Sequence, residues 1–117
     1  MRMLLAFEEE YRVYRDVIVG AIRALRPRVS VATSALGELG GQIEAFDPDL
    51  IISTQVNCTD LGGRNAWVEL SVDPLRPTEI CVGGRRSEQT NPTVEVLLAV
   101  VDEVESAVDK GEDPGGC

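Results

Sequence analysis

The sequence contains no histidine, few aromatic residues and no long apolar segment. The lack of histidine excludes Ser-His and Cys-His nucleophile pairs, histidine phosphate carriers and His-bearing metal sites. Catalysis would have to be carried by carboxylates, arginine, tyrosine, cysteine or Lys110. Aromatic residues make up only 4% of the 117 residues, so the core must be filled by Val, Leu, Ile and Ala. Because no apolar run is long enough for a membrane span or a signal peptide, we expect a cytoplasmic protein with no membrane partner.

The chain also lacks basic charge and a cysteine motif. Its net charge is −9, whereas nucleic-acid binding requires a basic surface, so we expect no nucleic-acid partner. Cys58, Cys81 and Cys117 show no C-x-x-C spacing, which argues against a disulfide framework and a zinc ribbon. The length is that of one domain, which we expect over residues 1–110, followed by a disordered acidic, Gly-rich tail over residues 111–117.

The segment 46–55 is the one around which the rest of the chain is organised. Pro48 ends the preceding helix and favours extended backbone before it. Residues 50–52 are Leu-Ile-Ile, with no polar side chain to face water, so they predict a central strand covered on both faces by helices. Ser53, Thr54 and Gln55 then emerge at the carboxyl end of the strand, where open α/β sheets keep their sites.

The first half alternates between strand and helix patterns. Residues 3–7 predict a strand, and apolar positions at helical spacing predict a helix over 11–25. Residues 29–33 predict a second strand and residues 36–46 a second helix. Strand, helix, strand, helix, strand is the pattern of a mostly parallel open sheet with helices on both faces.

The second half changes pattern. Residues 56–65 contain a Gly-Gly pair and no helical periodicity, so a loop takes the place of a third crossover helix. Residues 67–72 and 80–82 alternate between apolar and polar positions and are joined by too few residues for a parallel crossover. They therefore predict an antiparallel hairpin. Asn91-Pro92 predicts the start of a final helix that extends to Val108.

Three short motifs in the first half occur in a recognisable order. An apolar strand ends at Glu8-Glu9, Gly37-Glu38 opens the second helix, and Pro48-Asp49-Leu50 introduces the third strand. In this order and spacing the segment from about residue 3 to residue 54 resembles the receiver domain of bacterial response regulators. The resemblance implies a three-layer, flavodoxin-like open sheet, here completed by the C-terminal hairpin and the final helix.

The resemblance also implies roles for single residues. Glu8 and Glu9 stand where receivers hold the acids that bind Mg²⁺, and Ser71 matches the hydroxyl residue that ends the fourth strand. Thr54 stands in the place of the phosphoacceptor aspartate and cannot form an acyl phosphate. The lysine expected after the fifth strand is absent, and Arg85 or Arg86 is the nearest cation. The implied protein is a degenerate receiver that is not phosphorylated in the usual way.

Two functional hypotheses follow. The first is a non-enzymatic signalling or interaction module whose partner surface is the hairpin, with Trp67, Val68 and Leu70, together with the last helix. An open hairpin edge would also allow a homodimer.

The second hypothesis is a small enzyme or sensor that binds an anionic metabolite or a metal at the carboxyl ends of the first and third strands. Its candidate ligands are Glu8, Glu9, Thr54, Gln55, Ser71 and Arg85. No cofactor is expected beyond Mg²⁺ at the two glutamates, with Asp60 or Asp73 as the loop acid nearest to them. A site requires these side chains to converge on one cleft, whereas an interaction module exposes a contiguous apolar patch.

Overall fold

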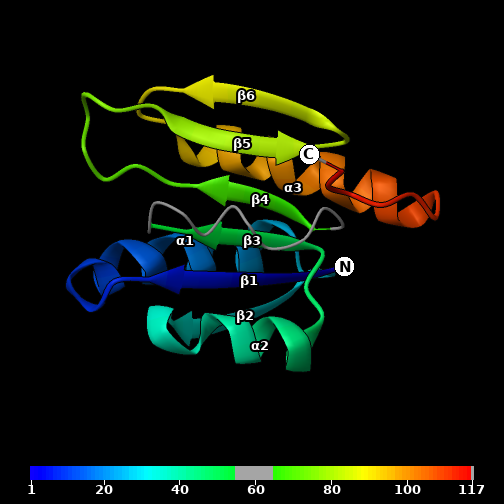
Figure 1. Ribbon diagram of the computed structural model, residues 1–117, viewed down its shortest axis with the longest axis horizontal. Helices are drawn as coiled ribbons and strands as arrows, with labels where there is room; N and C mark the ends of the chain where they lie inside the picture. The colour runs from blue at the N-terminus through cyan, green and yellow to red at the C-terminus, as the bar shows by residue number, and fades with distance from the viewer. Residues whose placement is uncertain (55–64, 117) are drawn as a thin grey trace.

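The computed structural model describes residues 1–54 and 65–116, which form an α/β fold around one six-stranded sheet of order β2-β1-β3-β4-β5-β6 (Figure 1). The strands are β1 Arg2–Phe7, β2 Ser30–Ala35, β3 Leu50–Ser53, β4 Ala66–Glu69, β5 Thr78–Val82 and β6 Arg85–Gln89. The helices are α1 Arg12–Leu25, α2 Leu39–Phe46 and α3 Val94–Asp109, and the short 3₁₀ turns η1 Glu9–Tyr11 and η2 Leu36–Glu38 precede α1 and α2.

The middle of the sheet is parallel. β1 pairs in parallel with β2 on one side and with β3 on the other, and β3 pairs in parallel with β4. All four residues of β3 are buried, as expected for a strand without a polar face. The prediction that the Leu-Ile-Ile segment runs through the sheet beside the first strand is confirmed.

Helices cover both faces of the sheet. The larger core cluster lies under α1 and α3 and contains Leu5, Ile52, Val68 and Val101. The smaller cluster lies on the opposite face and joins Leu39 of α2 to residues of β1, β3, β4 and β5. In one strand, neighbouring residues therefore serve different layers, because side chains of a strand alternate between its faces.

The C-terminal part of the sheet is antiparallel. The predicted hairpin is confirmed, with Trp67 of β4 opposite Cys81 of β5. The structure then adds β6, which pairs antiparallel with β5 and was not predicted from the sequence. Gly83 and Gly84 form the connection with φ angles of 60° and 76°, the positive values that a two-residue type I′ hairpin turn requires.

The start of the final helix and the segment after the helix differ from the expectation. The N-cap of α3 is Thr93, whose Oγ1 accepts a hydrogen bond from the N–H of Val96 at 3.3 Å. Asn91, the expected cap, instead has a positive φ of 49°. Residues 111–116, expected to be disordered, fold back onto the β5-β6 turn, where the N–H of Gly83 donates to the carbonyl of Pro114 at 2.8 Å.

The cysteine prediction also changes. Cys81 is fully buried and disulfide-bonded, although the spacing argued against a disulfide framework, and the other half of this bond lies outside the described residues. None of the described helices is long and apolar enough to cross a membrane.

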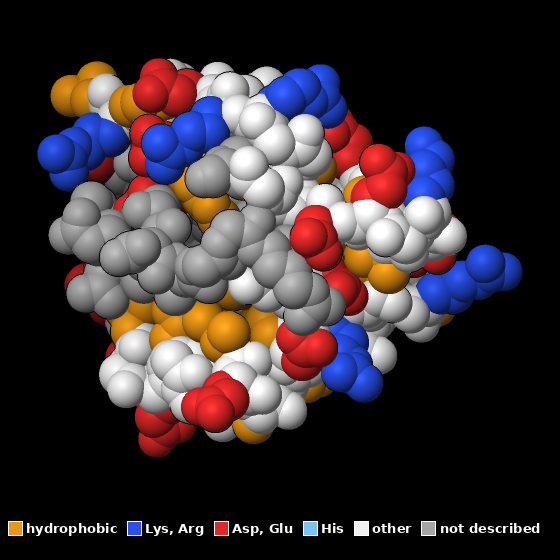
Figure 2. Space-filling model, turned by 45° about the vertical axis from the view of Figure 1, so that its right-hand side comes forward, with side chains coloured by type: hydrophobic (Ala, Val, Ile, Leu, Met, Phe, Trp, Pro, Cys, Tyr) orange, Lys and Arg blue, Asp and Glu red, His pale blue; other side chains and the backbone are white. Residues whose placement is uncertain are grey.

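On the face shown in Figure 2, the Lys and Arg side chains lie at the periphery and form no continuous stripe.

Candidate functional site

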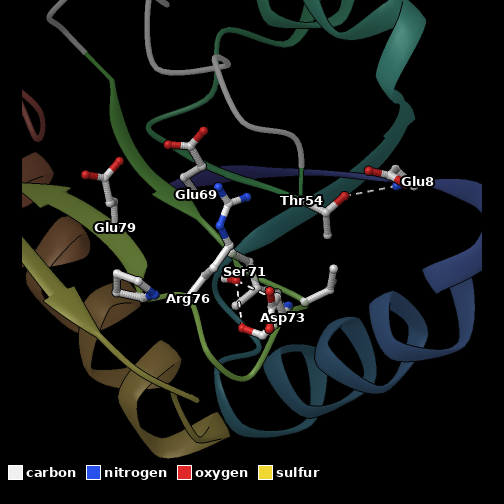
Figure 3. A pocket seen from close by; sticks show the side chains of 10 residues that line it. Glu8, Thr54, Glu69, Ser71, Asp73, Arg76 and Glu79 are labelled. Carbon is white, nitrogen blue, oxygen red and sulfur yellow. Dashed lines mark hydrogen bonds between the residues drawn. The ribbon is translucent and has the colours of Figure 1, made fainter.

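A cavity of about 610 Å³ lies at the carboxyl edge of the parallel strands. It takes residues from the ends of β1, β3 and β4, from the start of β5 and from the connection between β4 and β5 (Figure 3). This edge is where parallel strands of an α/β sheet gather their polar ends. The lining residues are Glu8, Thr54, Glu69, Leu70, Ser71, Val72, Asp73, Arg76, Pro77 and Glu79.

Thr54 joins the ends of β1 and β3. Its N–H donates to the carbonyl of Ala6 at 3.3 Å, and its Oγ1 accepts the N–H of Glu8 at 3.1 Å. The residue is 7% exposed, so this hydroxyl continues the strand pairing where the regular ladder ends. Its oxygen is therefore occupied by the backbone on one side of the cavity.

The floor opposite Thr54 is a tight turn between β4 and β5. The N–H of Ser71 donates to Oγ1 of Thr78 at 2.9 Å, and the hydroxyl of Ser71 donates to the carbonyl of Asp73 at 3.0 Å. The carboxylate of Asp73 accepts the N–H of Leu75 at 2.9 Å, the pattern in which an aspartate stabilises a turn through its own backbone. Thr78 is fully buried, so its hydrogen bond with Ser71 anchors the turn to the core.

The charge of the lining is negative. Among the described residues that line it are four carboxylates, those of Glu8, Glu69, Asp73 and Glu79, and one guanidinium, that of Arg76. In Figure 3 the Arg76 side chain points across the cavity in the direction of Glu69. A cavity with this balance favours a cationic or neutral polar group over an anion.

Glu8 differs electrostatically from an ordinary surface acid. Its side-chain hydrogen bond with Glu10 raises the pKa of Glu8, and burial and the charge of Glu10 raise it further. A carboxyl group that shares a proton with a neighbour keeps that proton to higher pH. Part of the negative charge on this side of the cavity therefore depends on pH.

The structure brings together three of the six ligand candidates expected from the sequence. Glu8, Thr54 and Ser71 line the same cavity, although they come from three separate segments. Glu9 instead forms an exposed ion pair with Arg12 at 3.2 Å. Gln55 lies outside the described residues.

Arg85 lies at the opposite edge of the sheet. β5 runs back from the cavity, so its far end and the start of β6 reach the amino edge, where Arg85 pairs with Glu103 of α3 at 3.1 Å. There it borders a separate groove of about 430 Å³ between β6 and α3. The expectation that Arg85 joins Thr54 came from the resemblance to receivers, and the antiparallel direction of β5 places Arg85 at the other edge.

The expected Mg²⁺ ligands do not gather. Glu8 faces the cavity and Glu9 faces Arg12, so the two neighbouring acids point to different surroundings. In residues 1–54 and 65–116, no group of three His, Cys, Asp or Glu side chains is arranged to hold a metal ion.

The residues expected at an interface are buried. Trp67 is 7% exposed, Val68 1% and Leu70 2%. Trp67 packs in the α2-side cluster, and the guanidinium of Arg86 lies 5.1 Å from the centre of its ring, within the range of a cation-π contact. These three side chains therefore belong to the core. The exposed strand of the antiparallel region is β6.

Three charged residues that line the cavity were not expected from the sequence: Glu69, Arg76 and Glu79. The register explains two of them, because Glu69 lies directly opposite Glu79 on neighbouring antiparallel strands. The alternation of apolar and polar residues in the sequence places these two acids on the face opposite Val68 and Ile80. It predicts that the two acids are neighbours only when the pairing of the two strands is also known.

Comparison of the chain with protein-family models, with curated proteins and with solved structures gives no match. The function must therefore be argued from the geometry of the described residues.

Proposed function

We propose that this chain is a receiver-like signalling or interaction module that acts by binding and is not phosphorylated in the usual way. The observation that carries the proposal is the bonding of Thr54. This residue directly follows β3, in the place that the phosphoacceptor has in receivers, and its Oγ1 accepts the N–H of Glu8 at 3.1 Å. A threonine cannot supply the carboxylate from which an acyl phosphate is made.

Three further observations support the proposal. The strand order begins β2-β1-β3-β4 with parallel pairing, which fits a flavodoxin-like, doubly wound sheet. Of the two acids that correspond to the magnesium ligands of receivers, Glu9 is paired with Arg12 at the surface. The chain also has no histidine that could act as a general base, which favours binding over catalysis.

The test is incubation of the purified protein with acetyl phosphate and Mg²⁺, followed by intact-mass measurement and by hydroxylamine treatment, which cleaves acyl phosphates. We expect no added phosphate, while a phosphorylation-competent receiver domain treated in parallel gains one. A hydroxylamine-sensitive phosphate on this chain would overturn the proposal.

A second candidate function is recognition of a small molecule in the cavity at the carboxyl edge. It is favoured by the convergence of Glu8, Thr54 and Ser71 on one space of about 610 Å³. Because the described lining holds four carboxylates and one guanidinium, we propose a small amine or other cation as the ligand class, in place of the anionic metabolite expected from the sequence.

Thermal melts test this second function, since a ligand that binds only the folded state raises the melting temperature. The probes are putrescine, Mg²⁺ and acetate, each added to wild type, to Glu79→Gln in the cavity and to Glu44→Gln on α2. We expect putrescine to raise the melting temperature of wild type and Glu44→Gln by more than that of Glu79→Gln. Equal shifts in all three proteins, or no shift, would remove this function and leave the first proposal untouched.

The partner proposed for the module is a protein or a second copy of the chain, bound through the edge of the antiparallel region. Nucleic acid is not proposed, because the chain carries a net charge of −9.

A further inference from the structure

The outer edge of the sheet at β6 is exposed and bears charges of both signs. All five residues from Arg85 to Gln89 are exposed, and β6 forms the end of the sheet in Figure 1, with no described strand beyond it. An unpaired strand edge presents a row of backbone N–H and C=O groups that another strand can join.

The turn before β6 determines which backbone groups face outward. In a two-residue hairpin turn the carbonyl of the first flanking residue accepts the N–H of the last, here Val82 and Arg85. Hydrogen-bonded and non-hydrogen-bonded pairs then alternate along the two strands. Arg85, Ser87 and Gln89 therefore direct their backbone groups toward β5, and Arg86 and Glu88 direct theirs outward.

We propose that two copies of this chain pair antiparallel through β6, with the two Ser87 residues opposite each other on a two-fold axis. In this register Arg86 of one copy lies directly opposite Glu88 of the other, and the same pair occurs twice by symmetry. These are also the two residues whose N–H and C=O groups point outward, so each pair is joined through the backbone and through its charges. This proposal rests on the proposed function, which places the partner surface at the edge of the antiparallel region, and it identifies the partner as a second copy of the chain.

The charges favour this register over its alternatives. Opposite charges directly across an antiparallel pair stabilise it, and like charges destabilise it. A parallel pairing in register would place Arg86 beside Arg86 and Glu88 beside Glu88. The sequence Arg-Arg-Ser-Glu-Gln is therefore complementary to itself in the antiparallel direction.

The single copy leaves an unfavourable row of carboxylates that the second copy relieves. Glu79 of β5 lies opposite Glu88 of β6, on the same face of the sheet. In the described part of the chain, no cationic side chain lies within ion-pair distance of Glu79 or Glu88. The second copy would place its Arg86 next to Glu88 and so add a cation to the end of this row.

The interface is small, because one short strand from each copy forms it, so the association should be weak and concentration-dependent. Sedimentation velocity over about 10 µM to about 1 mM covers dissociation constants in this range. We expect wild type to shift from monomer to dimer over this range. A monomer at every concentration would overturn the proposed dimer. It would not affect the proposed function, which the acetyl phosphate and cavity experiments test separately.

Charge reversals locate the interface. Glu88→Arg places Arg opposite Arg86 of the second copy, and we expect the dimer to be lost while the fold is kept, because this change also relieves the contact with Glu79. Arg86→Glu should have the same effect on the dimer, although it also removes the cation above Trp67. The double variant Arg86→Glu/Glu88→Arg should restore the dimer.

Two further variants control for charge and for backbone. Glu44→Arg makes the same charge change on α2, at the other end of the sheet, and should leave the dimer intact. Glu88→Pro removes an outward N–H that the single copy does not use, so it should abolish the dimer more completely than Glu88→Gln. A dimer that persists in Glu88→Arg, for instance through the exposed Val13 and Val17 of α1, would overturn the proposal, as would failure of the double variant to restore pairing.

Discussion

The guanidinium of Arg26 holds the carboxylate of Asp102 through two hydrogen bonds, Nε to Oδ1 at 2.6 Å and Nη2 to Oδ2 at 2.9 Å. The pair connects the residue that follows α1 to the middle of α3, 76 positions later in the sequence. A fork of two parallel bonds is the strongest form of such a pair, and it fixes the two helices of one layer to each other.

This pair makes the stability depend on pH. The hydrogen bonds from Arg26 lower the pKa of Asp102, against a smaller opposing contribution from burial. A carboxyl group whose pKa is lowered by folding stabilises the fold above its ordinary value of 3.8 and loses that contribution as the pH falls through the lowered value. We expect Asp102→Asn to lower the melting temperature at neutral pH.

Melting curves of wild type and Asp102→Asn, recorded from neutral pH to well below 3.8, check this expectation. The difference between the two proteins should shrink as the solution becomes more acidic. Asp109→Asn, an exposed acid on the same helix, is the control. A difference that stays constant with pH would mean that the ion pair does not contribute as argued.

Thr54 should matter for stability as well as for the proposed function. Thr54→Val keeps the shape but removes the acceptor of the Glu8 N–H, so we expect a loss of about 1 to 2 kcal/mol of unfolding free energy. Thr54→Ser keeps the hydroxyl and should lose less. Urea unfolding measures both, and a larger loss for Thr54→Ser than for Thr54→Val would show that the methyl group contributes more than the hydrogen bond.

Two glycines should respond to alanine with opposite signs. Gly20 is exposed inside α1, and a Cβ there meets nothing within 4 Å, so Gly20→Ala should add about 0.5 to 1 kcal/mol of stability. Gly84 has a φ of +76°, where an L residue is strained, so Gly84→Ala should remove about 1 kcal/mol or more. Chemical denaturation of the two variants in parallel tests the contrast, and a shared sign would contradict it.

The folded tail should be visible in amide exchange. The N–H groups of Gly83 and Gly84 donate to the carbonyls of Pro114 and Gly115 at 2.8 and 2.7 Å, so both should exchange slowly in hydrogen exchange followed by NMR. The amide of Glu88 points away from β5 and should exchange quickly in dilute protein. Fast exchange at the two glycines would mean that the tail does not hold the turn in solution.

The first half of the fold was predictable because its elements depend on local patterns. A Leu-Ile-Ile run without polar residues has one suitable environment, the middle of a covered sheet, and that is where β3 lies. β6 was missed because its five residues are all polar and exposed, so no apolar pattern marks it. Its strand structure comes from backbone pairing and from the Gly83-Gly84 turn, and a Gly-Gly pair after an alternating strand was the available signal.

The site was only half predictable for a related reason. Thr54 was expected because it follows the apolar third strand, and Ser71 because the resemblance to receivers implies a hydroxyl residue at the end of the fourth strand. Arg85 was misplaced and Glu79 was overlooked, since both positions depend on how β5 pairs with its neighbours. Pairing register is a property of two segments at once, which no single-segment pattern contains.

The connection over residues 73–77 fixes this register and so determines two properties together. It places Glu79 in the cavity and the next residue, Ile80, in the core under α3. Because strand side chains alternate, insertion of one residue before Thr78 would exchange the two sets, putting carboxylates into the apolar layer and aliphatic side chains into the cavity. Natural or engineered changes in the length of this loop should consequently be tolerated only when the same residues of β5 still face the cavity and the core. Loop length is therefore as informative as residue identity for recognising proteins built in the same way.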